Sequence, residues 1–399
     1  MTFIIIYSII ILLALINIIV IFFVKGMRGS KYLLKKRVCN SICVLIPARY
    51  ESEVIEDLIV SLENQTYKVN NEDIYVIVES LDDPTCEICK RHNVSIYLRQ
   101  DYSIKTKGYA LDETIKYILK NKSYDMYFIF DADNRLDPNF ILEMKKVYEE
   151  GYDYSIGKRY STNLKKNRFS YCSGLLFSLL NDLSNVNKQK QNKNIVASGT
   201  GYYISGDIIQ NLGGFPFNSL TEDYEFSLHA VVNHYKSYYN TRAIFYDEQP
   251  VDRKTTFTQR VRWCKGFQMA RKKYKKELRI LSHDPSVCDQ YFGVSYYISL
   301  IVIYVLGLIT SLVGFIYNMQ TLNFYLDHVI IFISLLAILL IGMEIVGLYV
   351  SFKTEEKRTF KSYVYTLFYF PIYLVQFIPI YFKARFTKVT WERIKHSGK

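Results

Sequence analysis

The sequence predicts an α/β domain with a largely parallel sheet, attached to helices that cross a membrane. Two patterns predict this fold class. From Cys39 to about Asp284, short runs of β-favouring residues alternate with amphipathic helical patterns, which is typical of parallel sheets covered by helices. On both sides of this segment lie apolar stretches of the ~20 residues that a helix needs to cross a ~30 Å hydrocarbon core.

The apolar stretches explain why half of the 399 residues are hydrophobic. The four stretches are Phe3 to Val24, Tyr291 to Tyr317, Val329 to Phe352, and Ser362 to Phe382. The first has no preceding basic residue and no small-residue cleavage site, so we expect a retained anchor rather than a signal peptide. Glu344 is the only charge in the third stretch, so we expect its side chain to face protein or water. Two interpretations of Glu344 stand side by side: a structural partner inside the helix bundle, and a residue on a transport path.

The chain carries a formal net charge of +12. Its basic residues gather beside the apolar stretches without a nucleic-acid-binding motif, so we expect contact with anionic lipid headgroups and no nucleic-acid partner. The run after the first stretch comprises Lys25, Arg28, Lys31, Lys35, Lys36 and Arg37. By the positive-inside rule this run places the segment up to about residue 290 in the cytoplasm. We therefore expect a protein that crosses the cell membrane several times.

These patterns divide the chain into five parts. We expect an N-terminal membrane anchor at 1–25, a cytoplasmic globular domain at 38–250, amphipathic interfacial helices at 251–285, membrane helices at 286–383 and a basic tail at 384–399.

The fourth apolar stretch is the least certain in its topology. It has basic residues at both ends and contains Pro371 and Pro379, so we expect it to kink and return, or to lie in the membrane interface. A cytoplasmic tail would then let Trp391, Ile394, Lys395 and His396 dock near the globular domain.

Specific strands and helices follow from the alternation. The strand patterns are Ser41 to Ile46, Ile74 to Val78, Ser95 to Leu98 and Tyr127 to Phe130; helical faces run from Val54 to Leu62, Ala110 to Leu119 and Tyr224 to Val232. Ligands of open α/β sheets bind outside the carboxyl ends of the strands, so polar residues directly after a strand are the first candidates for a site. We expect the polar run Lys188 to Lys193 to be a solvated loop.

Two carboxylates, Asp131 and Asp133, directly follow the apolar strand Tyr127 to Phe130. Hard oxygen ligands of this kind favour Mg²⁺ or Mn²⁺ together with phosphate oxygens. An acidic loop after a strand is often only solvated, but its position at a strand's carboxyl end favours a site for Mn²⁺ or Mg²⁺.

A second acidic motif, Thr221-Glu222-Asp223, opens the predicted helix Tyr224 to Val232. Thr221 suits an N-cap, and the acidic residues complement the positive end of the helix dipole. The same position is a rigid platform for a catalytic carboxylate, and both interpretations hold together.

The third motif combines Gln259, Arg260, Arg262 and Trp263. On a helix, Gln259, Arg262 and Trp263 lie on one face at i, i+3 and i+4. An amphipathic helix at a membrane surface would also bring Trp and Arg together. That interpretation does not explain why Gln259 shares the face.

In order and spacing, the D-x-D, T-E-D and Q-R-x-R-W motifs resemble the processive, membrane-bound family 2 glycosyltransferases: cellulose, chitin, hyaluronan and poly-N-acetylglucosamine synthases. The resemblance covers nearly the whole chain and implies the α/β GT-A fold of nucleotide-diphospho-sugar transferases. The loop from Leu45 to Glu51 is similar to the family's first nucleotide-binding loop, with Tyr50 where Asn is usual.

The resemblance implies a role for each site residue. Asp223, with Glu222 beside it, is the expected catalytic base. The nucleotide sugar is expected to contact Pro47, Arg49, Glu51, Glu79 or Asp82, Lys107, Asp131, Gln259, Arg260 and Arg262. The acceptor is expected to contact Gly199, Thr200 and Trp263, and the metal is expected at Asp131 and Asp133.

The implied function is that of an inverting hexosyltransferase. It would move a sugar from a UDP-sugar, with UDP-N-acetylglucosamine and UDP-glucose first among the donors, onto a growing β-linked polysaccharide exported across the membrane. One alternative is a transferase that adds a single sugar to a membrane lipid. Another is an inactive scaffold or transporter, which is disfavoured because every expected carboxylate is present. The sequence names neither the sugar nor any partner protein.

Overall fold

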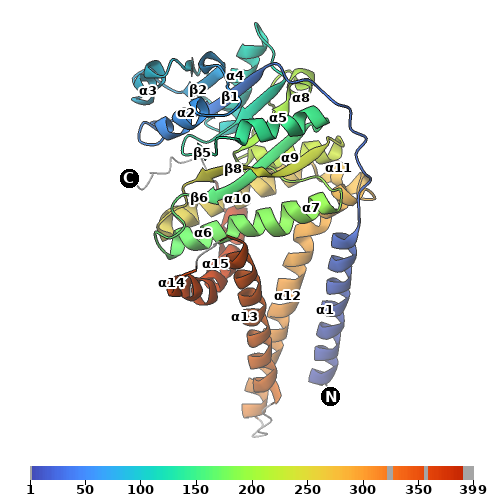
Figure 1. Ribbon diagram of the computed structural model, residues 1–399. Helices are drawn as coiled ribbons and strands as arrows, with labels where there is room; N and C mark the ends of the chain where they lie inside the picture. Colours follow the sequence, from blue (N-terminus) through green and yellow to red (C-terminus); the bar gives the residue numbers. More distant parts are fainter. Residues whose placement is uncertain (1, 321–326, 355–357, 390–399) are drawn as a thin grey trace.

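The computed structural model describes residues 2–320, 327–354 and 358–389. A domain with helices on both faces of a sheet lies above a group of long helices (Figure 1). Trp391, Ile394, Lys395 and His396, for which docking was expected, lie outside the described residues.

The strands of the domain are β1 (Ile42–Pro47), β2 (Ile74–Val78), β3 (Ser95–Leu98), β4 (Met126–Ile129), β5 (Arg135–Leu136), β6 (Tyr154–Ser161), β7 (Tyr202–Ser205) and β8 (Ser237–Asp247). Its helices are α2 (Ile55–Glu63), the 3₁₀ turn η1 (Asn71–Asp73), α3 (Thr85–Arg91), α4 (Lys107–Leu119), α5 (Phe140–Glu150), α6 (Arg168–Ser178), the π-helical η2 (Leu179–Asn185), α7 (Val186–Lys190), α8 (Gly206–Leu212), α9 (Glu222–Val232), α10 (Arg253–Lys273) and α11 (Lys275–Ile280).

The remaining helices are α1 (Thr2–Gly26), α12 (Pro285–Gln320), α13 (Asp327–Thr354), α14 (Phe360–Val364), the π-helical η3 (Tyr365–Tyr369), α15 (Phe370–Val375) and α16 (Phe377–Phe386). Four segments are long and apolar enough to cross a membrane: Phe3–Gly26, Val302–Gln320, Asp327–Thr354 and Phe360–Phe386.

The described strands form one sheet in the order β3-β2-β1-β4-β7-β6-β8-β5. Its first four strands are parallel, as expected, but β7 runs antiparallel to both β4 and β6, so the sheet is mixed. The predicted strands Ile74–Val78 and Ser95–Leu98 are confirmed. The sequence pattern does not predict β5, β6, β7 and β8: β5 has only two residues, and polar residues interrupt the apolar pattern of β6 and β8.

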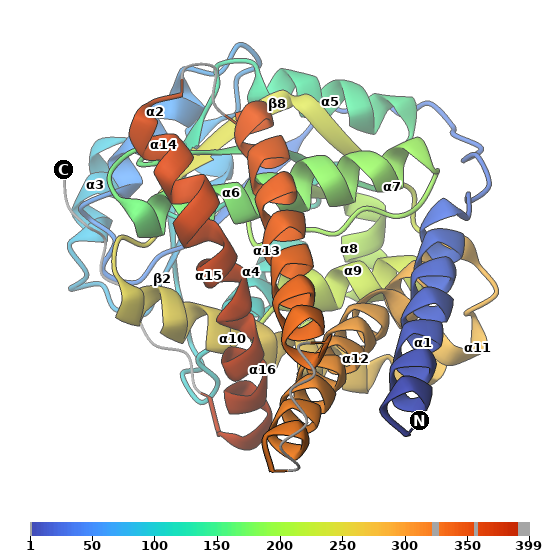
Figure 2. The same cartoon turned by 90° about the horizontal axis from the view of Figure 1, so that it is seen from below.

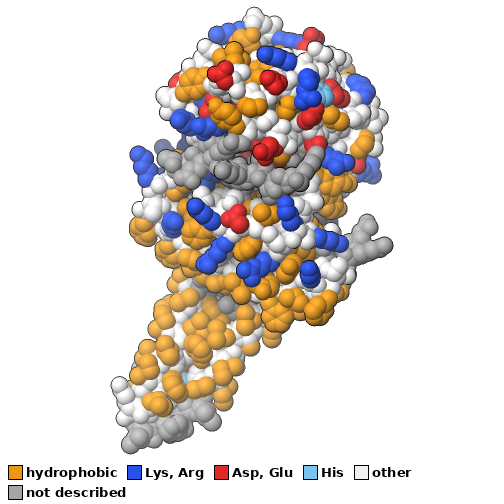
Figure 3. All heavy atoms as spheres, turned by 90° about the vertical axis from the view of Figure 1, so that its left-hand side faces the viewer, with side chains coloured by type: hydrophobic (Ala, Val, Ile, Leu, Met, Phe, Trp, Pro, Cys, Tyr) orange, Lys and Arg blue, Asp and Glu red, His pale blue; other side chains and the backbone are white. Residues whose placement is uncertain are grey.

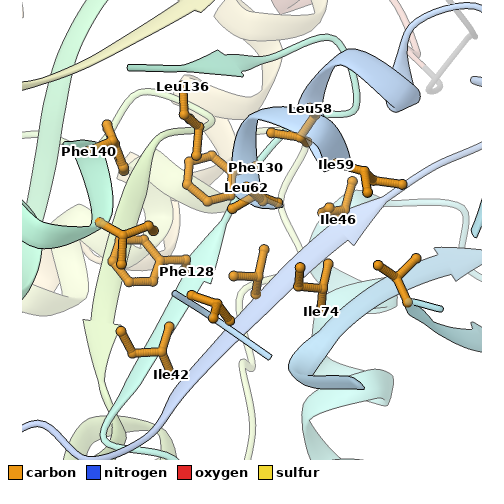
Figure 4. Close-up of a cluster of buried hydrophobic side chains, with 14 of the residues drawn as sticks. Ile42, Ile46, Leu58, Ile59, Leu62, Ile74, Phe128, Phe130, Leu136 and Phe140 are labelled. Carbon is orange, nitrogen blue, oxygen red and sulfur yellow. The ribbon is translucent and has the colours of Figure 1, made fainter. Parts of the chain in front are cut away.

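Both faces of the sheet are covered. On one face, Leu58 of α2, Cys89 of α3 and Met144 of α5 pack on the strands, and Figure 4 shows the centre of this layer. On the other face, Leu111 of α4 and Phe226 of α9 are fully buried against the strands. The two layers hold the strand ends in fixed positions, and these ends carry the candidate site.

The fourth apolar stretch is divided by the π-helical η3 and by a break at Gln376. Tyr373 of α15 packs against α6, and Ile380 of α16 packs against Val261 of α10. Seen from below, α14, α15 and α16 run across the underside of the domain (Figure 2). The stretch is therefore joined to the domain along much of its length.

The structure corrects one expectation for the polar run Lys188 to Lys193. This run is no solvated loop: its first part is the end of α7, and the side chains of Lys188 and Lys193 are 8% and 2% exposed. Both lysines contact segments distant in sequence, as described below.

Candidate active site

A cavity of about 2580 Å³ opens at the carboxyl ends of β1, β2 and β4 and continues between the long helices. Most of the expected site residues line it: Pro47, Arg49, Glu51, Glu79, Lys107, Asp131, Asp133, Gly199, Glu222, Asp223, Gln259, Arg262 and Trp263. Asp82, Thr200 and Arg260 are not among its lining residues. Segments more than 200 residues apart in sequence thus meet at one place.

The loop after β4 carries the two carboxylates, Asp131 and Asp133. The backbone N–H of Asp131 donates to the Thr200 hydroxyl at 2.8 Å and to the Asn134 side chain at 3.2 Å. The Thr200 hydroxyl in turn donates to Asn134. Thr200 is 1% exposed, so it fixes the loop from behind, and the expectation that it contacts the acceptor is not met.

Lys107, at the first turn of α4, connects the acidic motifs. Its Nζ lies 2.5 Å from Asp131 Oδ1 and 3.8 Å from Glu222, and donates to the Gly199 carbonyl at 2.7 Å. Burial opposes the charge of Lys107, but Asp131 and Glu222 raise its pKa above the ordinary value. The lysine therefore stays cationic between the carboxylates.

Glu222 and Asp223 form the first turn of α9. Burial raises the pKa of Glu222 to about 7, against the opposing effect of Lys107. Burial also raises the pKa of Asp223, while backbone N–H groups of Tyr224 and Gly199 oppose the shift. Gly199 adopts φ +82° beside Asp131 and Asp223, a left-handed conformation that favours glycine. Carboxylates with raised pKa are suited to accept a proton near neutral pH.

Helix α10 presents Gln259, Arg262 and Trp263 to the cavity, on the single face that the sequence predicted. At Gly266, one turn further along, an added Cβ would lie 2.5 Å from the Thr221 hydroxyl, so this glycine lets α10 approach the T-E-D motif closely. Burial lowers the pKa of Arg262, while Glu222, Asp131 and Asp223 oppose that change. Arg262 is the cation that α10 offers to these carboxylates.

Arg260 does not fit the expected contact with the pyrophosphate. Its side chain is fully buried and donates to the Ser173 hydroxyl at 2.6 Å and to the Tyr373 hydroxyl at 2.8 Å. The guanidinium also lies over the Trp263 ring at 3.9 Å. Arg260 therefore joins α10 to α6 and α15, away from the cavity.

The loop after β1, which the resemblance implies is the first nucleotide-binding loop, contributes Arg49. Its Nε lies 2.9 Å from Glu79, and the buried Arg99 contacts the same carboxylate at 3.4 Å. Asp82 is exposed and turned to its own loop, where Ser80 is its hydrogen-bond partner. Of the two acidic residues that the sequence left open, Glu79 is the one in the cavity.

Sequence reasoning missed Arg159 and Asp247, which also line the cavity. Their side chains pair at 3.3 Å, and Arg159 donates to the Ser198 carbonyl beside Gly199. Burial raises the pKa of Asp247 to about 6, against the effect of Arg159. Asp247 is the last residue of β8, so the strand-end rule would have found it had the strand been predicted.

The acidic loop has the donor atoms that a hard metal ion requires. Asp131 and Asp133 offer carboxylate oxygens at the cavity wall, but among the described residues no three His, Cys, Asp or Glu side chains converge on one point. The pair therefore fits a divalent cation whose remaining ligands are water and the phosphate oxygens of a substrate, as Mg²⁺ and Mn²⁺ accept.

A strand-end acidic loop, buried carboxylates and cationic side chains in one cavity fit a glycosyltransferase of the GT-A fold. Residues 128–346 match the model of "Glycosyl transferase family group 2", and residues 43–210 match "Glycosyl transferase family 2". Because the first match covers more than half of the chain, the protein belongs to the family 2 group of glycosyltransferases.

Similar proteins agree with this class. The "Probable glycosyltransferase YdaM" of Bacillus subtilis is 22% identical over 82% of this chain and 78% of its own length. The catalytic chain of a UDP-forming cellulose synthase of Dictyostelium discoideum is 35% identical, but over only 17% of this chain and 6% of that protein. The mannosyltransferase PcManGT of Pyrobaculum calidifontis, solved with GDP-mannose and Mn²⁺, superposes with a TM-score of 0.59 at 12% identity, over 94% of this chain and 98% of that one. This last likeness shows the fold.

Proposed function

We propose that the protein transfers a sugar from a UDP-sugar to a hydroxyl group with inversion at the anomeric carbon, and that Asp223 is the base. The observation that carries the proposal is the single cavity that holds Asp223, Lys107, Asp131 and Arg262. A buried carboxylate with a raised pKa can take the acceptor proton. With one base and in-line displacement, an α-linked donor yields a β-linked product.

The cationic side chains suit the leaving diphosphate. Lys107 and Arg262 face the carboxylates from α4 and α10, so a diphosphate entering the cavity meets positive charge from two sides. A guanidinium offers two parallel donors to phosphate, which favours Arg262 for this contact. Asp131 and Asp133 would hold Mn²⁺ or Mg²⁺, which supplies further charge stabilisation to the departing phosphate when bound.

Two similar proteins bear on the donor nucleotide, and their names point to different nucleotides. The cellulose synthase match is named UDP-forming, whereas the structurally similar mannosyltransferase holds GDP-mannose with Mn²⁺. Glu79, which pairs with Arg49, falls where the family that the sequence resembles often has an Asp that contacts uridine, and this supports a UDP-sugar.

We further propose that the enzyme is embedded in the cell membrane with its catalytic domain in the cytoplasm. Figure 3 shows hydrophobic side chains gathered on the lower, narrow part of the molecule and charged side chains on the upper part. The four apolar segments and the basic residues after the first one support this orientation.

The topology can be tested by cysteine labelling in intact cells. We expect a membrane-impermeant reagent to modify a cysteine placed at Met319, the exposed far end of α12, but not one at His283, beside the domain. His283→Cys should react only after permeabilisation. Labelling of His283→Cys in intact cells would overturn the cytoplasmic assignment.

Two acceptors are proposed. A growing polysaccharide is supported by Gln259 and Trp263 in the cavity wall, because an aromatic face suits a sugar ring. A single sugar added to a membrane lipid is supported by the aliphatic lining between the helices, including Ile18, Val305 and Leu335. This lining gives a polar chain few hydrogen-bond partners, so the geometry favours the lipid-borne acceptor.

Product sizing decides between the acceptors. The purified full-length protein is given UDP-N-acetylglucosamine, UDP-glucose or GDP-mannose with Mn²⁺ and a lipid extract. Lipid carrying one added sugar supports the lipid acceptor, and a ladder of long products supports the polysaccharide. Hydrolysis and transfer absent with every donor would contradict the proposed function.

A further inference from the structure

Four charged side chains meet where α1 ends and α12 begins, beside α7. They are Lys25, Lys188, Lys193 and Asp289, and we call them the lysine cluster. Figures 1 and 2 place α7 next to the domain ends of α1 and α12. The cluster thus lies where the charged domain gives way to the apolar helices.

The cluster contains more positive than negative charge. Lys25 Nζ lies 2.7 Å from Asp289 Oδ1, and Lys188 Nζ lies 3.6 Å from Asp289 Oδ2. Lys193 donates to the carbonyls of Val24 and Lys25 and so caps the carboxyl end of α1. Among the described side chains, the carboxylate of Asp289 contacts Lys25 and Lys188, whereas Lys193 contacts the two backbone carbonyls.

Of the three lysines in the cluster, Lys188 is the one whose position is least explained by a structural role. The Lys25–Asp289 pair already joins α1 to α12, and Lys193 already caps α1. Lys188 shares Asp289 only at a distance beyond a hydrogen bond, although its side chain is buried. Burial lowers the pKa of Lys188 to about 8, partly opposed by Asp289. A buried cation with half a counterion is costly, and an anion beside it would remove that cost.

The cluster opens into the cavity, and an apolar groove continues from it. Lys25, Lys188 and Asp289 line the cavity. Along α1 the lining continues with Ile18, Ala14 and Ile11, which share the face of Lys25. At ~1.5 Å per residue this stripe extends ~21 Å, enough for an acyl chain in one leaflet of a ~30 Å hydrocarbon core.

We propose that Lys188 and Lys25 bind the phosphate group of a membrane lipid whose chain lies along α1, in the apolar part of the cavity. The lysines suit the phosphate head group of such a lipid, and the aliphatic groove below them suits its acyl chain. Phosphate carries the charge that the cluster lacks, and ammonium groups bind it as point charges. The inference rests on the proposed membrane location of α1 and α12, and it does not depend on which sugar is transferred.

Native mass spectrometry of the full-length protein in detergent tests this site without any donor sugar. The protein is titrated with phosphatidic acid, with phosphatidylcholine, and with glycerol 3-phosphate, which has the head but no chains. We expect phosphatidic acid to be retained preferentially. Lys188→Gln should weaken its retention about tenfold to a hundredfold, the loss of one or two charge-assisted hydrogen bonds.

Three controls accompany the titration. Lys190→Gln changes an exposed lysine on the same helix and should leave retention unchanged. Lys188→Arg keeps the charge and should restore much of the binding, and cooperative thermal unfolding shows that each variant is folded. Because UDP binding and sugar transfer are measured separately, their failure would contradict the proposed function without affecting the lipid result.

Two outcomes would overturn the inference. Equal retention of phosphatidic acid by the unmodified protein and a folded Lys188→Gln variant would show that the lysine does not bind the head. Displacement of phosphatidic acid by an equal concentration of glycerol 3-phosphate would show that the site takes soluble phosphate and that the lipid chain adds nothing.

Discussion

Arg260 and Arg262 stand two residues apart on α10 and point to opposite sides of it. Arg260 donates to Ser173 and Tyr373 in the interior, whereas Arg262 lines the cavity that holds the carboxylates. Two residues of a helix are separated by about 200° of rotation, so both cannot reach one ligand. The two arginines of one motif therefore have separate tasks.

Substitution of these arginines should separate stability from binding. Arg260→Ala removes three hydrogen bonds and a contact with Trp263, so we expect a loss of about 1.5–4.5 kcal/mol of folding stability, at ~0.5–1.5 kcal/mol per hydrogen bond. Arg262→Ala should weaken nucleotide binding about tenfold to a hundredfold with little change in the unfolding temperature. Thermal unfolding and nucleotide titration measure the two effects. If Arg260→Ala unfolds at the normal temperature but binds the nucleotide more weakly, Arg260 acts in the cavity and the prediction is wrong.

Asp223→Asn should lower the rate of sugar transfer by about 10²–10⁴, the contribution of a positioned base. Nucleotide affinity should stay nearly unchanged, because the base acts on the acceptor proton. Asp207→Asn is the matched control, since Asp207 is an exposed acid in the first turn of α8. If Asp223→Asn loses nucleotide affinity in proportion to its rate, Asp223 is a binding residue instead.

Glu222 should make stability depend on pH. Its folded-state pKa is about 7 against an ordinary value of 4.5, so the folded protein holds this proton more tightly. Stability therefore falls as pH rises from about 4.5 to about 7, by ~1.4 kcal/mol per pKa unit of the shift. Glu222→Gln lacks this titration and should raise the unfolding temperature more at pH 8 than at pH 5.

Glu150→Gln, at an exposed position at the end of α5, is the control for this measurement and should show the same small effect at both pH values. An equal effect of Glu222→Gln at pH 5 and pH 8 would mean that the carboxyl does not titrate between these pH values, which would contradict the prediction.

Metal removal should weaken nucleotide binding through the acidic loop. We expect a chelator to lower the affinity of the protein for UDP, and Mn²⁺ to restore it. Asp133→Asn should reproduce the chelated state and gain little from added Mn²⁺, because Asp131 alone is a poor site. Isothermal titration with and without Mn²⁺ measures this. Full Mn²⁺-dependent affinity in the variant would exclude Asp133 as a ligand.

Substitutions of Glu79 and Asp82 should have different effects on nucleotide affinity, although both residues follow β2. Glu79→Gln removes the carboxylate that holds Arg49 and Arg99, and we expect a loss of nucleotide affinity of about tenfold. Asp82→Asn changes an exposed residue and should have no effect. If a nucleotide titration shows that Asp82→Asn lowers the affinity more than Glu79→Gln does, Asp82 is the residue that contacts the nucleotide.

Local sequence patterns are enough to predict several features of this protein. The carboxylates at Asp131 and Asp133 were placed at a strand end because the four preceding residues are apolar. The shared face of Gln259, Arg262 and Trp263 follows from helix geometry alone, and the four apolar segments follow from length and composition. These properties need only neighbours along the chain.

Which side chains are buried, and which residues they contact, depends on how distant segments pack together. Asp247 and Arg159 join the site because β8 pairs with β6. Lys188 is buried because α7 packs where α1 and α12 meet, although its own segment is as polar as a surface loop. Arg260 and Arg262 are the same residue type in the same motif, and only the position of α10 between α15 and the cavity separates them. Burial is set by segments distant in sequence, so no local pattern contains it.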